Sequence, residues 1–226
     1  RLVKEKDRFL TVPVGPGVTY RYLPQSKWKT LSIDVFCISP LRRETVTELA
    51  LVPRLSKRGT ANLPTLRALA QHLDEMYGSS LSADTTKIGP AQVIRFGMDV
   101  PSLEGQSLGK AMAFIWDVAT NPYLTGGAYP VDRFDIEREE HRRDILSIVN
   151  NRPRYATVRL IQELSKGSDS GLPAWGVLDD LAKMDPQKTW ETWGDVLATS
   201  SVSIYAIGDG ATELADILQR ASLEFP

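Results

Sequence analysis

Apolar and polar residues alternate over several short stretches of the chain, which is the period of a half-buried strand. In the clearest stretch every second residue from Leu31 to Cys37 is apolar. The predicted strands are 18–23, 31–37, 80–87, 91–100 and 201–207. The first two are expected to form an antiparallel pair, and the turn residues Gly89 and Pro90 predict a hairpin between the third and the fourth. Residues 1–17 are polar and rich in turn residues, which indicates an arm or an edge segment.

Apolar residues spaced three and four positions apart predict helices in the rest of the chain. The predicted helices are 44–55, 64–77, 102–119, 131–150, 153–165, 185–199 and 211–221. Helix 44–55 is apolar almost throughout after its polar start, and a helix without a polar face is a buried one. Ser102 and Asp185 are the expected N-caps of two other helices. This order predicts one α+β domain over 1–226, in which a mostly antiparallel sheet of five or six strands carries helices on one face.

The residues that follow the buried helix carry a distinctive motif. They read R-G-T at 58–60, then an amphipathic helix, then L-D-E-M-Y-G-S-S-L at 73–81. This order resembles the first domain of the pitrilysin/insulinase-type zinc metallopeptidases, in the branch whose members keep the fold and lack the metal site. The resemblance covers nearly the whole chain. It implies a LuxS/mitochondrial-processing-peptidase-like architecture and a second similar domain beyond residue 226.

The zinc motif of that family, H-x-x-E-H, lies on the buried helix. Aligning the G-T of the family on Gly59-Thr60 puts its two histidines on Ala50 and Arg54 and its general base on Pro53. A catalytic zinc needs three protein ligands and an open position for water. Ala50 has no lone pair to offer, and a guanidinium keeps its proton. The sequence therefore predicts no catalytic residue, no metal and no other cofactor.

The third zinc ligand of the family is a glutamate on a later helix. The stretch E-H-R-R-D-I-L at 140–146 resembles the family pattern there, so the resemblance places this ligand on Glu140, which is 140 − 54 = 86 positions after Arg54. We hypothesise that Arg54 fills the space of the missing ion and pairs with Glu140. The alternative is that both side chains point to solvent.

Bulk composition excludes several classes of function. The formal net charge is −1, so the chain lacks the strong positive charge of nucleic-acid-binding or membrane-surface proteins. No apolar run approaches the ~20 residues of a membrane-spanning helix. The single cysteine, Cys37, excludes an internal disulfide framework, and no leader-like segment opens the chain. These observations favour a cytoplasmic protein, with Cys37 and His141 packed in the interior.

The resemblance implies a function for a domain without the motif. Such a domain pairs with a second domain, or as a homodimer or heterodimer with a related zinc-bearing subunit. The pair encloses a chamber, and an extended peptide adds to an exposed sheet edge. Two alternatives stay open from the sequence, which leaves it undecided whether the chain is an enzyme. One is an active zinc metalloendopeptidase whose motif lies elsewhere, and the other is a purely structural protein–protein interaction domain.

Overall fold

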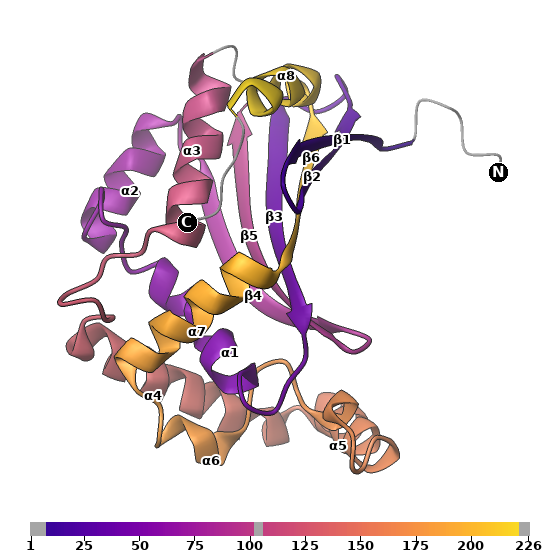
Figure 1. The fold of residues 1–226 in the computed structure, drawn as a ribbon, viewed down its shortest axis with the longest axis vertical. Helices are drawn as coiled ribbons and strands as arrows, with labels where there is room; N and C mark the ends of the chain where they lie inside the picture. Colours follow the sequence, from indigo (N-terminus) through magenta and orange to yellow (C-terminus); the bar gives the residue numbers. More distant parts are fainter. Residues whose placement is uncertain (1–7, 102–105, 222–226) are drawn as a thin grey trace.

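The computed structural model describes residues 8–101 and 106–221 of the chain. In these ranges the α+β class is confirmed, because one sheet carries helices packed against it (Figure 1). The predicted N-cap at Ser102 lies outside the described residues. None of the helices in the described ranges combines the length and the apolar composition that a bilayer crossing requires.

The sheet contains six strands in the described part of the chain. They are β1 (Leu10–Gly15), β2 (Val18–Pro24), β3 (Thr30–Pro40), β4 (Ser80–Ile88), β5 (Ala91–Pro101) and β6 (Ser201–Gly208). Their order across the sheet is β1-β2-β6-β3-β5-β4. Neighbours are antiparallel except for β2 and β6, which are parallel. The predicted hairpin of β4 and β5 is confirmed, and β4 forms the edge of the sheet.

The expected pairing of strands 18–23 and 31–37 is wrong. Strand β6 lies between them, parallel to β2 and antiparallel to β3. On β6 the side chains of Val202, Ile204 and Ala206 are buried. In the middle of the sheet the helices cover this buried face of the strand. The backbone groups on both edges of the strand also find hydrogen-bonding partners there. The C-terminal strand therefore takes the place that proximity in the sequence had given to a β2–β3 hairpin.

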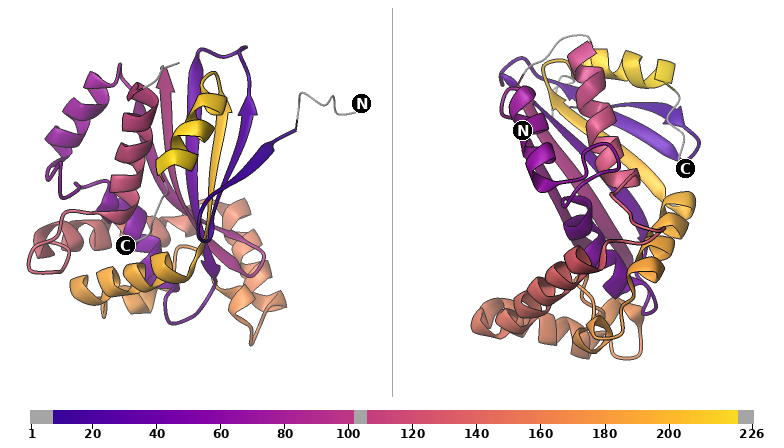
Figure 2. Two further views of the ribbon diagram at one scale, coloured as in Figure 1. Left: turned by 45° about the horizontal axis from the view of Figure 1, so that its top comes forward. Right: turned by 90° about the vertical axis from the view of Figure 1, so that its left-hand side faces the viewer.

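Helices cover one face of the sheet, while α4 (Val131–Ser147) and α5 (Arg152–Leu164) lie towards its lower end in Figure 2. The other longer helices are α1 (Val46–Ser56), α2 (Leu66–Glu75), α3 (Gln106–Thr120), α7 (Pro186–Thr199) and α8 (Ala211–Ala221). The shorter pieces are α6 (Leu178–Leu181) and the 3₁₀ turns η2 (Ile148–Asn150) and η3 (Asp169–Gly171). Helices α1, α3, α7 and α8 contact the strands directly, and α4 packs on α1.

Helix α1 is the buried helix that the sequence predicts. Only Glu48 and Arg54 of its eleven residues fall outside the buried class. Leu49 and Val52 belong to the main core beneath the sheet, whereas Leu51 and Leu55 belong to a second cluster that contains Phe134 of α4. Helix α1 therefore holds the sheet and α4 at a fixed separation, and the space between them is the candidate site.

Cys37 occupies the core position that the alternation predicts. It is buried on β3, and burial raises the pKa of its thiol to about 12. The thiol therefore stays protonated and packs as a small apolar group.

Candidate functional site

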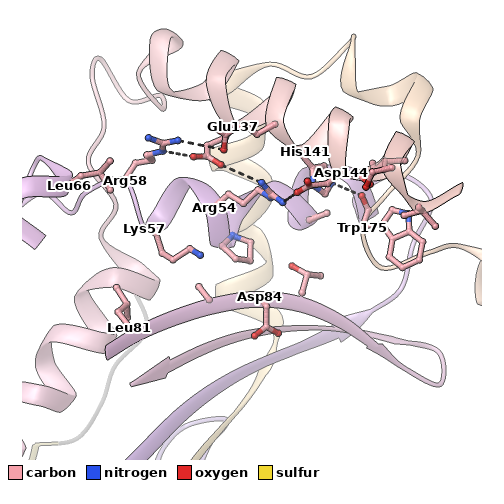
Figure 3. Close-up of a pocket in the computed structure, with 18 of the residues that line it drawn as sticks. Arg54, Lys57, Arg58, Leu66, Leu81, Asp84, Glu137, His141, Asp144 and Trp175 are labelled. Carbon is pink, nitrogen blue, oxygen red and sulfur yellow. Dashed lines mark hydrogen bonds and ion pairs between the residues drawn. The ribbon is translucent and has the colours of Figure 1, made fainter. Parts of the chain in front are cut away.

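A groove of about 940 Å³ lies between the edge strand β4 on one side and helices α1 and α4 on the other (Figure 3). Helix α2 lines it with leucines, and the loop that carries Trp175 lines it with an indole. Three of the four family positions predicted from the sequence, Ala50, Pro53 and Arg54, line this groove together with Glu140. The structure therefore brings all four predicted positions to one place.

One face of α1 forms the wall opposite β4. Ala50, Pro53 and Lys57 are spaced i, i+3 and i+7, which puts them on the same side of a helix. Ala50 and Pro53 are buried, and neither brings a side-chain donor or acceptor. Proline also lacks the backbone N–H, so it cannot donate to the carbonyl one turn earlier. This wall is apolar at the positions that align with one of the family's two histidines and with its general base, and Lys57 is the first charged group along it.

Two guanidinium groups point towards α4, that of Arg54 on α1 and that of Arg58 in the turn just after this helix. Arg58 Nε donates to Glu137 Oε1, and Arg54 donates to Asp144 while its second terminal nitrogen lies 3.8 Å from Glu137 Oε2. Arg58 also lies 3.8 Å from Glu140. Glu137 is buried, with two cations against its carboxylate.

The predicted pair between Arg54 and Glu140 is replaced by this arrangement. Among the described residues, the carboxylates in ion-pair range of Arg54 are Glu137 and Asp144. Glu140 is directed away, with its side chain 52% exposed, and reaches Arg58 instead. The reason is the register of α4, in which Phe134, Glu137 and His141 form the buried stripe. The buried carboxylate that faces Arg54 therefore comes one turn earlier than Glu140, 137 − 54 = 83 positions after Arg54.

The residues present do not fit the zinc ion that the family implies. The Arg54 guanidinium occupies the space between Glu137 and Asp144, and Ala50 offers no ligand atom. In the described ranges no three His, Cys, Asp or Glu side chains are grouped so that they could hold a metal. The positive charge that zinc would bring is supplied by arginine, whose charge is permanent.

His141 is packed in the interior, as the sequence predicts, but it keeps one free nitrogen. Its Nε2 lies 2.7 Å from the carbonyl oxygen of Trp175. Burial lowers the pKa of His141, so the ring is neutral near pH 7 and Nε2–H donates to that carbonyl. Nδ1 is then an acceptor that is buried and has no partner among the described residues. The Oγ1 atom of Thr85, on β4, is buried and unpartnered in the same way.

Strand β4 borders the groove from Leu81 to Thr85. Within the described residues β4 pairs with β5 only, so its second edge has no strand beside it. Leu81, Ala83 and Thr85 are half-buried and line the groove, and they alternate with exposed residues. Beyond Thr85, Lys87 Nζ donates to the carbonyls of Ser170 and Leu172, at 2.6 and 3.1 Å, which fixes the loop at this end.

Comparison with known proteins gives one curated relative. No family model matches the chain. The chain is 31% identical, over 198 residues, to a probable inactive metalloprotease, YmfF, of Bacillus subtilis (strain 168). The match covers 85% of this chain and 46% of that protein.

Solved structures share the fold. A conserved protein from Enterococcus faecalis V583 superimposes with a TM-score of 0.84 and 24% identity over 94% of this chain and 52% of its own. A peptidase M16 inactive domain from Pseudomonas fluorescens superimposes with a TM-score of 0.72 and 12% identity over 97% of this chain and 51% of its own. The chain therefore spans about half the length of each of these three proteins.

Proposed function

The chain belongs to the pitrilysin-type metallopeptidase family as a member without the zinc motif, and on this premise we propose that it is a non-catalytic domain that holds an extended peptide against β4. A single observation carries this proposal. A sheet edge without a neighbouring strand, in the described residues, borders a groove whose metal position is filled by Arg54. Backbone groups of such an edge are free to pair with an added strand.

We further propose that a second domain or subunit completes the chamber around this groove. The three similar proteins described above are each about twice as long as this chain, which supports a partner domain of similar size. Helix α5 supports it as well, because its side chains include Leu160 and Leu164, exposed by 58% and 78%. Contiguous exposed apolar side chains are typical of protein–protein contact sites. A cytoplasmic location is part of the same proposal, supported by the single buried thiol of Cys37.

The experiment changes the peptide and leaves the protein intact. An extended labelled peptide is made in two forms, N-methylated at alternate residues in either of the two possible phases. Along a strand successive N–H groups point to opposite sides, so only one phase removes the groups that pair with β4. Fluorescence anisotropy should show that one form loses binding and the other keeps it.

The outcome separates this function from its alternatives. Equal binding of the two forms would refute strand addition. Absence of binding by any extended peptide, with a partner domain still captured, would favour the purely structural interaction domain. An active peptidase would cleave the unmethylated peptide in a chelator-sensitive way, which the filling of the metal position by Arg54 argues against.

A further inference from the structure

Among the described residues, the groove is lined by as many cations as carboxylates, but the ion pairs are unevenly shared between them. All four lining carboxylates are paired: Glu137 and Glu140 contact Arg58, Asp144 contacts Arg54, and Asp84 lies 3.1 Å from Arg95. Two of the lining cations, Lys57 and Arg154, have no carboxylate within ion-pair range in the described part of the chain. As far as the described residues go, the groove therefore offers a ligand two unpaired cations, and each of its carboxylates has an arginine partner.

These two cations stand at separate places along β4. Lys57 extends from α1 into the space between that helix and the strand (Figure 3). Arg154 comes from the first turn of α5, and its guanidinium lies 5.1 Å from the centre of the Trp175 ring. It borders both the main groove and a smaller cavity of about 440 Å³ that reaches Thr85. A peptide lying along β4 would pass Lys57 and Arg154 in turn.

We infer that the groove selects extended peptides that carry two carboxylate side chains, one for Lys57 and one for Arg154. This inference rests on the proposed peptide-binding function and names its substrate class. Both cations belong to the helical layer, so both carboxylates must leave the added strand on the same side. Side chains on one side of a strand recur at every second residue. The two acidic residues are therefore an even number of positions apart along the peptide, at i and i+2 or at i and i+4.

The same arrangement disfavours basic peptides. A peptide lysine or arginine in the groove would meet Lys57 and Arg154, which have no ion-pair partner among the described residues, and the lining carboxylates already contact arginines. Like charges brought together in this way provide discrimination that attraction alone does not. Thr85 Oγ1 and the acceptor nitrogen of His141 add two polar atoms that a peptide N–H or hydroxyl can satisfy.

The test measures peptide affinity by fluorescence anisotropy with the full-length protein. The probes are labelled peptides of the length of β4, nine residues, that differ only at two positions. Replacing both glutamates by glutamine should weaken binding about tenfold, since an accessible ion pair accounts for roughly a threefold change in affinity. Moving one glutamate so that the two are an odd number of positions apart should weaken binding about threefold, since only one of them can then form an ion pair with the groove.

Protein variants assign the effect to the groove. Lys57→Glu should reverse the preference, so that the peptide with lysine at that position now binds better, and Lys57→Arg should keep the original ranking. Lys110 is an exposed cation on α3 that does not line the groove, and Lys110→Glu makes the same change in net charge. It should leave the ranking unchanged.

Two results would overturn the inference. Equal affinity for the glutamate and glutamine peptides would remove the charge preference while leaving peptide binding intact. An equal effect of Lys110→Glu and Lys57→Glu would assign the preference to overall charge and not to the groove. If no peptide binds whatever its charge, the proposed function fails together with the inference.

Discussion

Glu137 and Glu140 provide a direct test of how α4 faces α1. They lie on the same helix three positions apart, and the same substitution by glutamine can be made at each. Glu137 is buried against Arg54 and Arg58, whereas the side chain of Glu140 is 52% exposed. Glutamine keeps the size of the side chain, removes its charge and exchanges one acceptor oxygen for an NH2 group, so the comparison applies the same chemical change to a buried and to an exposed position.

The expected cost of Glu137→Gln follows from its two partners. Breaking a fully buried ion pair by removing one partner costs about 3–5 kcal/mol. Here the side chains of Arg54 and Arg58 are 29% and 24% exposed. In the Glu137→Gln variant each of them would still have a second carboxylate as a partner. Water and these remaining partners reduce the cost, so we expect the free energy of unfolding to fall by about 2 kcal/mol. Glu140→Gln should change it by less than about 0.5 kcal/mol.

The assay is urea unfolding of the two variants and the parent protein, with the free energy taken from the linear dependence on urea. A double-mutant cycle adds the partner, because Arg58 donates directly to Glu137 while Arg54 stands 3.8 Å away. The coupling energy of Glu137 with Arg58 should therefore exceed its coupling with Arg54. Equal losses for Glu137→Gln and Glu140→Gln, or a larger loss for Glu140→Gln, would refute the assignment of the facing carboxylate.

Two further predictions concern stability. Since the folded-state pKa of His141 is lowered, the unfolded chain binds the proton more readily, and stability should fall as pH drops below about 6.5 towards the lowered value. His141→Gln keeps a donor for the Trp175 carbonyl and should remove this part of the pH dependence of unfolding; an unchanged slope would contradict it. Gly59 has φ +151°, and an added Cβ would lie 2.8 Å from the backbone of Pro64. Gly59→Ala should cost about 2–3 kcal/mol, against about 1 kcal/mol for Gly78→Ala, whose Cβ would meet nothing within 4 Å; equal melting shifts would contradict it.

Much of the fold follows from local patterns in the sequence. The buried helix α1 and the β4–β5 hairpin are encoded within short windows, where apolar spacing and turn residues suffice to predict them. The position of β6 is not encoded locally. Its pairing of Val18 with Val202 joins residues far apart in the chain, and the alternation of a strand does not state its neighbours.

The candidate site divides in the same way. Its location follows from α1, where Ala50 and Arg54 align with two ligands of the family and Pro53 aligns with its general base. The facing carboxylate does not follow as simply, because α4 carries several glutamates and a charged residue is normally read as exposed. The buried stripe of Phe134 and His141 would have identified it, since Glu137 lies three positions after the first and four before the second. At position 137 the helical spacing of the buried residues indicates burial, whereas the charge of a glutamate indicates exposure, and the spacing gives the correct answer.

If α1 and α4 have kept the geometry of a metal site, replacing three residues should restore one. Ala50→His and Arg54→His put two imidazoles one turn apart on α1, and Pro53→Glu returns the missing backbone N–H of the helix. Removing the Arg54 guanidinium also leaves Glu137 Oε2, which lies 3.8 Å from it, open to act as the third ligand, while Arg58 still donates to Oε1.

Dialysed protein of the triple variant should retain zinc at one ion per chain, measured by elemental analysis. Adding Glu137→Gln should remove the ion, whereas adding Glu140→Gln should leave it, because Glu140 points towards Arg58 and solvent. If Glu140→Gln removes the ion and Glu137→Gln leaves it, the third ligand is Glu140 and not Glu137. A triple variant that folds and binds no zinc would show that the two helices no longer hold the spacing of a metal site. The loss of the ion would then involve a change of backbone geometry as well as the exchange of side chains.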